Sequence, residues 1–185
     1  MKPLNENYKN AEASTGNDFV ALPPGAYICR ITDAIDHDEE KPFIEVTFDI
    51  ADGEHKGYYS DDWGTKNLWA HSRRHYYTDK AMGMFKGFIK AVDESNGTNF
   101  NAEVETGFDE SKLIGKLIGY VVGEEEYESN TGEIRTRLDW RNAKVRSVSQ
   151  IKSGKCAVPP KKTLKVSEPP ISDGFGPITD DDMPF

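Results

Sequence analysis

Residues 63–90 interleave aromatic rings with positive charge. The rings of interest are Trp63, Trp69, His75, Tyr76 and Tyr77. The cations are Lys66, Arg73, Arg74, Lys80, Lys86 and Lys90, with Asp79 as the only acid of the segment. Cations can follow a phosphate backbone while unpaired bases stack on rings, each stack contributing about 1–3 kcal/mol. We therefore predict that this segment binds single-stranded nucleic acid; the alternative is that rings such as Trp63 and Tyr76 lie in the core.

A second candidate surface lies in the strand expected over residues 133–148. Its candidate binding residues are Arg135, Arg137, Trp140 and Arg141. Arg135 and Arg137 are two residues apart and therefore share one face of a strand. A guanidinium group can pair with phosphate and also stack on a base. The alternative is a solvated face whose arginines pair across a hairpin with Glu124, Glu126 and Glu128.

The remaining reactive side chains do not form a catalytic or metal-binding pattern. His71 and His75 are four residues apart, but no Cys or third His lies near them in the sequence, so no metal site is predicted. There is no phosphate-loop signature and no Gly-x-Ser-x-Gly, and no carboxylate is singled out as an acid or base. We therefore expect a protein that is not an enzyme and that uses no cofactor.

Cysteine usage and hydropathy bound the compartment. Cys29 and Cys156 lie far apart in different kinds of segment, which argues against a disulfide framework. No run of about 18 apolar residues occurs, and the N-terminal residues lack the apolar stretch of a secretory signal. These features predict a protein of the reducing cytoplasm that does not contact the membrane.

Apolar patterning predicts the elements that would position these residues. Strands are expected over 27–35, 43–50 and 57–63, followed by a helix over 80–94 and strands over 116–127 and 133–148. The helix is indicated by apolar residues at i, i+3 and i+4 spacing, from Met82 to Val92. Thr78 and Asp79 are expected to cap its start, and Asn96-Gly97 its end. Residues 129–132 are expected to form a hairpin turn.

Five strands with a helix between the third and fourth follow the order of a Greek-key OB-type barrel. We therefore predict a mainly β domain over 19–149, a flexible N-terminal arm over 1–18 and a disordered tail over 150–185. An antiparallel sandwich would have much the same order of elements. The tail is predicted from its composition, because 152–166 carry five Lys and no acid, 167–185 carry five acids and no base, and both are rich in Pro and Gly.

The charge distribution also contains evidence against nucleic-acid binding. The net charge of the chain is −9, whereas a phosphate backbone attracts Lys and Arg. In an OB-type barrel the loops after strands 1 and 4 help to hold the ligand. Here they would be residues 36–40 and 124–128, and both are acidic. The path of a bound strand is therefore expected to follow the aromatic and basic side and to avoid these loops.

The last six residues are an acidic run followed by apolar residues: Asp180, Asp181, Asp182, Met183, Pro184 and Phe185. A terminal Phe offers a ring for a pocket and a carboxylate for a basic residue beside it, and the Asp run adds attraction to a basic rim. This ending resembles the C-terminal tip of bacterial single-stranded DNA-binding proteins. The body, with Leu22-Pro23-Pro24-Gly25-Ala26-Tyr27 and Leu113-Ile114-Gly115-Lys116, resembles small replication proteins of bacteriophages.

The resemblance implies a phage-encoded, OB-type protein that binds single-stranded DNA in replication or recombination, in the cytoplasm of a bacterial host. Its C-terminal tip would recruit replication or recombination enzymes. We expect binding without catalysis and with little sequence preference. Two alternatives remain open: an acidic adaptor or inhibitor that binds a replication enzyme without contacting DNA, and an RNA-binding protein.

Overall fold

The computed structural model describes residues 21–164, so the predicted N-terminal arm and C-terminal tip lie outside the described residues. The strands are β1 (Gly25–His37), β2 (Phe43–Ile50), β3 (Ser72–Tyr76), β4 (Leu117–Val122), β5 (Glu124–Glu128), β6 (Ile134–Leu138) and β7 (Lys144–Arg146). The α-helices are α2 (Asp62–Lys66), α3 (Met82–Asn96), α4 (Phe100–Glu103) and α5 (Val148–Lys152). Short 3-10 helices occur at η1 (Leu68–Ala70), η2 (Glu110–Leu113) and η3 (Trp140–Asn142).

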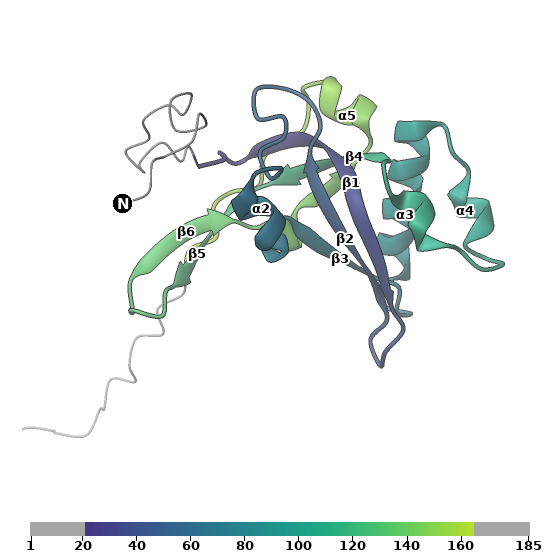
Figure 1. Ribbon diagram of the computed structural model, residues 1–185, viewed down its shortest axis with the longest axis horizontal. Coiled ribbons are helices and arrows are strands. Elements are labelled where there is room, and N and C mark those ends of the chain that lie inside the picture. Colours follow the sequence, from purple (N-terminus) through teal and green to yellow (C-terminus); the bar gives the residue numbers. More distant parts are fainter. Residues whose placement is uncertain (1–20, 165–185) are drawn as a thin grey trace, which may run out of the picture.

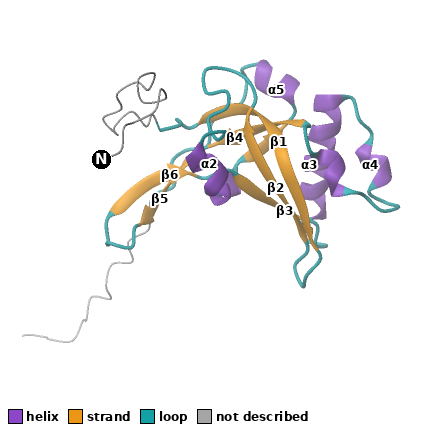
Figure 2. Ribbon diagram, viewed as in Figure 1, coloured by secondary structure: helices purple, strands orange, loops and turns teal. Residues whose placement is uncertain are grey.

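The main body is a curled, five-stranded antiparallel sheet with the strand order β3-β2-β1-β4-β7. Strands make up most of the centre of the molecule, and α3 and α4 lie together at one end (Figures 1 and 2). The sheet forms a half-barrel whose two edge strands are β3 and β7. The mainly β class predicted from the sequence is confirmed, and the curled sheet is compatible with an OB-like barrel.

The length of β1 explains why the sheet curls. Residues Gly25–Arg30 of β1 pair with β4, whereas Cys29–His37 pair with β2, so the two ends of one strand belong to different parts of the wall. The register with β2 shifts between Ile31 and Asp33, which marks a bulge. Bulges bend a strand and increase its twist. A single long, bent strand therefore connects the two halves of the half-barrel.

The core fills the concave side of this sheet and extends under α3. The α3 residues Phe85, Phe88, Ile89 and Val92 are buried, as the helical spacing of the sequence predicted. They belong to one cluster with the inward residues of β1, β2 and β4, among them Ile31, Val46, Phe48, Ile118 and Tyr120. Gly97 ends α3 in the left-handed conformation, with φ of 66°, which confirms the predicted helix end.

The β5–β6 hairpin forms a separate two-stranded sheet, here called the arm, that projects from the body on the side opposite α3 and α4 (Figure 1). Its strands pair antiparallel from Glu124 opposite Leu138 to Glu128 opposite Ile134. The predicted hairpin turn over 129–132 is confirmed. Almost all of β6 is exposed, whereas the residues of β2 and β4 are mostly buried.

The third strand does not lie where the sequence predicted it. Residues 57–63 form turns and the start of α2, and the third strand is β3. Gly57 has φ of 76°, and a Cβ at Gly64 would lie 2.1 Å from the carbonyl oxygen of Tyr59, so both positions require glycine. The Asp49 carboxylate accepts a hydrogen bond from the Tyr59 amide and the Asp61 carboxylate accepts one from the Gly64 amide. Side chains therefore satisfy this backbone in place of a strand partner.

Other boundaries differ by shorter distances. The two long strands predicted over 116–127 and 133–148 are each broken, at Gly123 and at η3. Gly123 lies against Pro159, whose carbonyl oxygen would be 3.0 Å from a Cβ at this position. The N-cap of α3 is Ala81 rather than Thr78 or Asp79, and it makes no side-chain capping bond.

The region predicted as a tail from residue 150 is ordered over its first part. Residues 148–152 form α5, which begins with a capping box between Ser147 and Gln150. Further along, Lys162 forms a parallel bridge with Glu125 of β5. The predicted start of the tail is therefore corrected for residues 150–164, and 165–185 lie outside the described residues.

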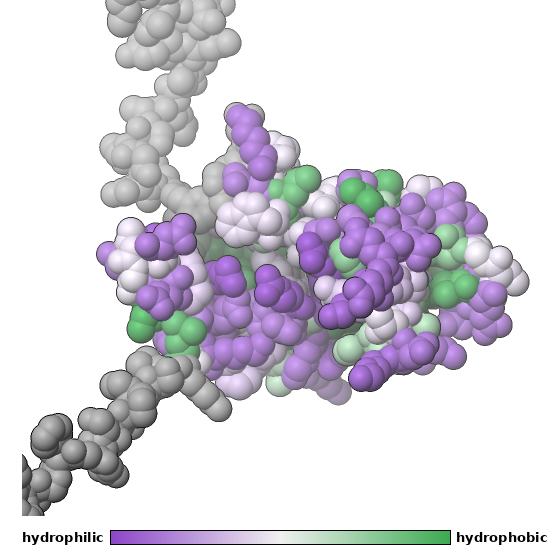
Figure 3. All heavy atoms as spheres, turned by 90° about the horizontal axis from the view of Figure 1, so that it is seen from below, coloured by the Kyte–Doolittle hydropathy of each residue, from purple (hydrophilic) through white to green (hydrophobic). Residues whose placement is uncertain are grey.

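The surface of the described residues is mixed in character. Seen from below, it is mostly hydrophilic, and hydrophobic side chains form separate patches (Figure 3). Within residues 21–164, no helix combines the length and the apolar character that a membrane crossing requires.

Candidate nucleic-acid interface

Strand β3 places alternate residues on opposite sides of the half-barrel wall. Arg74 and Tyr76 are exposed, whereas Arg73 and His75 turn inward. The Arg74 guanidinium lies over the ring of Phe43, with Cζ 4.8 Å from the ring centroid. Tyr76 packs against the same ring at a centroid distance of 5.2 Å. Arg74 and Tyr76 thus form an exposed cation and ring pair at the edge of the sheet.

Arg73 connects the two edges of the half-barrel. It donates a hydrogen bond to the carbonyl oxygen of Ala143, next to β7, and its Cζ lies 5.3 Å from the ring centroid of Tyr120. Burial lowers the pKa of Arg73 below its ordinary value, and the neighbouring Tyr120 and Asp139 oppose this shift. Arg73 therefore holds the seam between β3 and β7, in contrast to the free phosphate-binding cation that the sequence predicted.

Two of the predicted stacking rings lie in the core. His75 is 6% exposed, stacks on Phe88 at a centroid distance of 3.7 Å, and lies 3.0 Å from the hydroxyl of Tyr120. Trp140 is also 6% exposed and donates from Nε1 to the hydroxyl of Tyr59 at 3.0 Å. Neither ring can stack on a base while the core remains closed. The predictions for His75 and Trp140 are therefore corrected.

Trp69, in η1, is accessible to a ligand. It is 68% exposed, and its Nε1 donates to the side-chain oxygen of Asn67 at 3.2 Å. Lys66, at the end of α2, is exposed as well. The side chain of Trp63 lies outside the described part of the structure. Of the tryptophans whose side chains are described, Trp69 is mostly exposed and Trp140 is buried.

His71 fixes the segment that carries Trp69. Its Nδ1 lies within hydrogen-bonding distance of the Phe48 carbonyl oxygen, and its Nε2 is 3.0 Å from that of Gly64. Its ring stacks on Tyr59 at a centroid distance of 4.5 Å. His71 therefore joins α2 to β2 and is not available as a metal ligand.

A groove of about 1590 Å³ runs along the seam between β3 and β7 and extends to the arm, to η1 and to the outer face of α3. Its charged and aromatic lining includes Trp69, Arg73, Arg74, Tyr76, Lys90, Arg137, Arg141, Lys144 and Arg146. Arg and Lys outnumber Asp and Glu among the lining residues, although the whole chain has a net charge of −9. The groove lining therefore carries a small excess of positive charge in an acidic protein.

The groove gathers part of the predicted site. The predicted residues that line it are Trp69, Arg73, Arg74, His75, Tyr76, Arg137, Trp140 and Arg141. Lys66, Tyr77, Lys80, Lys86 and Arg135 are not among its lining residues. Tyr77 is half-buried against Phe85 and donates its hydroxyl hydrogen to Asp36 at 2.8 Å.

The arm arginines are engaged in ion pairs. Arg137 lies opposite Glu125 in the hairpin register and contacts its carboxylate at 2.8 Å. Arg135 pairs with Glu133 at 2.6 Å. Arg137 therefore forms the cross-strand ion pair that the alternative prediction describes. Its partner is Glu125, and not Glu124, Glu126 or Glu128. Exposed pairs of this kind contribute about 0–1 kcal/mol, so a phosphate can displace them.

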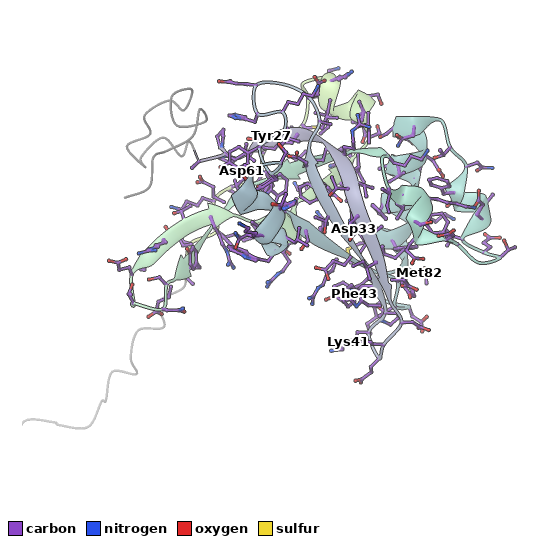
Figure 4. All side chains as sticks on the ribbon, in the orientation of Figure 1. Tyr27, Asp33, Lys41, Phe43, Asp61 and Met82 are labelled. Carbon is purple, nitrogen blue, oxygen red and sulfur yellow. The ribbon has the colours of Figure 1, made fainter. Side chains whose placement is uncertain are left out.

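The two acidic segments occupy different positions. The loop between β1 and β2 lies at the outer end of that hairpin, and Figure 4 shows Lys41 there, far from Tyr27 and Asp61. Residues 124–128 are not a loop but strand β5 of the arm. The first segment is therefore clear of the groove wall, whereas Glu124 and Glu125 of the second line the groove.

Sequence reasoning missed the role of Asp139 and Lys162. Asp139 is 5% exposed, lines the groove and contacts the Lys162 ammonium. The two residues are 23 positions apart, and no periodic pattern connects them. Only the return of the chain along β5 brings them together.

No protein-family model and no curated protein matches this chain. Within residues 21–164, no group of three or more His, Cys, Asp or Glu side chains is arranged to hold a metal ion. What the protein does is therefore inferred from its structure, a curled antiparallel sheet with exposed rings and cations along the seam between β3 and β7. Such a surface suits an extended, negatively charged chain with exposed bases.

Proposed function

We propose that this protein binds single-stranded DNA in the groove along the β3–β7 seam, without catalysis and with little sequence preference. The observation that carries the proposal is the exposed ring of Trp69 in the same groove as Arg74, Arg141, Lys144 and Arg146. Cations along a backbone path and accessible rings are the two parts that single-strand binders combine. The resemblance of its last six residues to bacterial single-stranded DNA-binding proteins agrees with this function.

We also propose that the sheet is a Greek-key barrel of the OB type. The order β3-β2-β1-β4-β7, with α3 between β3 and β4, corresponds to five barrel strands with the helix after the third. Contact between Arg73 and Ala143 brings the two edge strands together. In this proposal the arm is an enlarged connection between the fourth and fifth barrel strands, a region that contributes to ligand binding in OB folds.

Titration with an oligonucleotide of mixed sequence tests the proposal through tryptophan fluorescence. Stacking should quench the emission at low salt, and added salt should reverse the effect because phosphate contacts are screened. In a Trp69→Phe variant most of the quenching should be lost. Tighter binding to duplex than to a single strand of equal length would contradict the proposal, since paired bases hide their faces.

The acidic adaptor remains the second candidate, because the net charge is −9 and the arm carries acids at the groove. An adaptor should show no salt-reversible fluorescence change with any oligonucleotide. We propose that residues 180–185, which lie outside the described residues, bind a replication or recombination enzyme. Deleting them should abolish capture of that enzyme and leave single-strand binding intact or stronger, because three Asp no longer compete with phosphate.

A further inference from the structure

Residues 159–164, here called the strap, lie beside β5 and are joined to it by an isolated parallel bridge between Lys162 and Glu125. The Lys162 amide donates to the Glu124 carbonyl oxygen at 2.9 Å, and the Glu126 amide donates to the Lys162 carbonyl oxygen at 2.8 Å. At its start, Pro159 packs closely on Gly123, where a Cβ would lie 3.0 Å from the Pro159 carbonyl oxygen. The strap thus belongs to the arm, although the chain reaches it only after leaving the half-barrel through α5.

The strap also neutralises acids of the arm. The Lys161 ammonium lies 3.0 Å from Glu126, and the Lys162 ammonium lies 2.5 Å from Asp139. The pair with Glu126 is exposed enough for water to screen it. The pair with Asp139 is different, because the Asp139 side chain is 5% exposed. A buried carboxylate that loses its partner is costly, whereas an exposed one is not.

Asp139 is a junction between the arm, the groove and the barrel wall. Its amide donates to the Gly123 carbonyl oxygen at 2.9 Å, and its carboxylate accepts from the Asn142 amide at 3.2 Å, at the start of η3. Burial by itself would raise the pKa of Asp139, but hydrogen bonds from Lys162 and Asn142 outweigh it and hold the pKa below its ordinary value. The carboxylate is therefore ionised, and Lys162 balances its charge.

The 3-10 helix η3 starts at this junction and places Arg141 in the groove. Trp140 faces the core, which fixes the orientation of η3, and Arg141 is exposed in the groove. Without Lys162, the Asp139 carboxylate would lose its paired ammonium and keep only the Asn142 hydrogen bonds and the nearby charge of Arg73, two residues from Arg141. An approaching phosphate would then meet a negative charge at this point of its path.

We infer that Lys162 is a positioning residue for single-strand binding, which neutralises Asp139 in the groove wall and holds η3 with Arg141 against the arm. This inference rests on the proposed function. If Lys162 has this role, residues 159–164, whose composition predicts a disordered tail, belong to the nucleic-acid interface. Lys162 does not contact the ligand in this arrangement but acts through Asp139.

The test compares Lys162→Gln with Lys155→Gln in the full-length chain. Both variants remove one positive charge from an exposed lysine of the same region, but only the Lys162 ammonium lies against the Asp139 carboxylate. At low salt, Lys162→Gln should weaken single-strand binding about fivefold, and Lys155→Gln less than twofold. The difference should vanish near 1 M salt, where the screening length is about 3 Å. Equal losses in the two variants would overturn the inference.

Two further variants separate charge balance from a purely structural effect. Lys162→Arg should keep the affinity, and the double variant Asp139→Asn/Lys162→Gln should regain it because no uncompensated charge remains. Loss in the double variant as large as in Lys162→Gln would overturn the charge argument.

A measurement without DNA distinguishes this inference from the proposed function. In Lys162→Gln, amide hydrogen exchange at Glu126 and Asn142 should become faster than in Lys155→Gln, because the strap and the η3 cap lose an anchor. If the unaltered protein binds no single strand, the proposed function fails whatever the exchange rates are. If it binds and Lys162→Gln binds equally well, only the role of Lys162 fails.

Discussion

Arg73 and Arg74 are neighbours on β3, yet they lie on opposite sides of the half-barrel wall. Arg73 holds the seam against Tyr120 and Ala143, whereas Arg74 lies over Phe43 with a Glu45 carboxylate 3.8 Å from its Nε. The two described tryptophans divide in the same way, with Trp140 in the core and Trp69 exposed. Residue type alone therefore does not separate the inner region from the outer one. The side of the strand or turn on which a residue falls decides its role.

The largest expected effect is the difference in stability between variants of the two tryptophans. Trp140→Ala should lower the free energy of unfolding by about 3–5 kcal/mol, because a buried ring is lost together with its hydrogen bond to Tyr59. Trp69→Ala should change it by less than about 0.5 kcal/mol, as expected for an exposed side chain. Urea denaturation measures both. Similar stabilities for the two variants would remove the distinction between the core and the groove.

The arginine pair provides the second test. Arg73→Ala should destabilise the protein by about 1.5–3 kcal/mol, because the seam loses a hydrogen bond from a charged group. Arg74→Ala should leave stability nearly unchanged and reduce the slope of log affinity against log salt by about 0.7, the amount for one phosphate contact with a single strand. An Arg74→Lys variant serves as the control that keeps the charge. If the salt slope of the affinity changed in Arg73→Ala and not in Arg74→Ala, the phosphate groups would have to contact the seam itself.

The third test uses pH, because the inner face contains a buried histidine. Burial, together with the nearby Arg73, lowers the pKa of His75 well below its ordinary value of 6.5. The unfolded chain therefore binds a proton at a pH where the folded chain does not, so stability is complete above about pH 6.5 and falls as the pH drops below it. The slope from this residue approaches about 1.4 kcal/mol per pH unit. Denaturation between pH 7 and 5 measures it.

A variant at this residue assigns that acid slope. His75→Phe keeps an aromatic ring in the core and should flatten the slope by the contribution of one proton. An unchanged slope in a folded His75→Phe variant would show that His75 is not the group that couples folding to protons.

The smallest expected effect is a difference between the two cysteines in how fast a disulfide reagent modifies their thiols. Cys29 is buried on β1, and burial raises the pKa of its thiol well above the ordinary value. Cys156 is half-exposed between α5 and the strap. A disulfide reagent should therefore modify one thiol quickly in the native protein and the other only on unfolding. Rapid modification of the thiol that remains in a Cys156→Ser variant would indicate that the half-barrel opens readily near β1.

Some elements could be predicted because short-range chemistry determines them. The apolar residues from Phe85 to Val92 recur at helical spacing, and they bury one face of α3. β2 alternates Ile44, Val46 and Phe48 with polar residues and has the predicted bounds, Phe43–Ile50. The left-handed Gly97 and the turn over 129–132 require only local backbone geometry. These patterns are visible to anyone who reads a few residues at a time.

The site was only partly predictable, because its members are decided by long-range contacts. β3 was missed since its inward residues are Arg73 and His75, which carry no apolar signal, and they become core residues only beside Tyr120. Trp140 was assigned to the surface since it follows a row of arginines, yet the core of the half-barrel receives it. A polar side chain buried against a distant strand has no local signature.

Local sequence patterns are enough to predict the mainly β class, the helix, the hairpin and the enrichment of cations and rings in residues 63–90. Which rings and cations meet depends on the folded chain, because alternation along β3 and closure of the seam separate Arg73 from Arg74 and Trp140 from Trp69. The folded chain also positions residues 159–164, whose composition is that of a tail. The acids of β5 and the buried Asp139 hold this segment because the folded chain brings it back beside them, and that pairing across the fold is a property no single stretch of sequence contains.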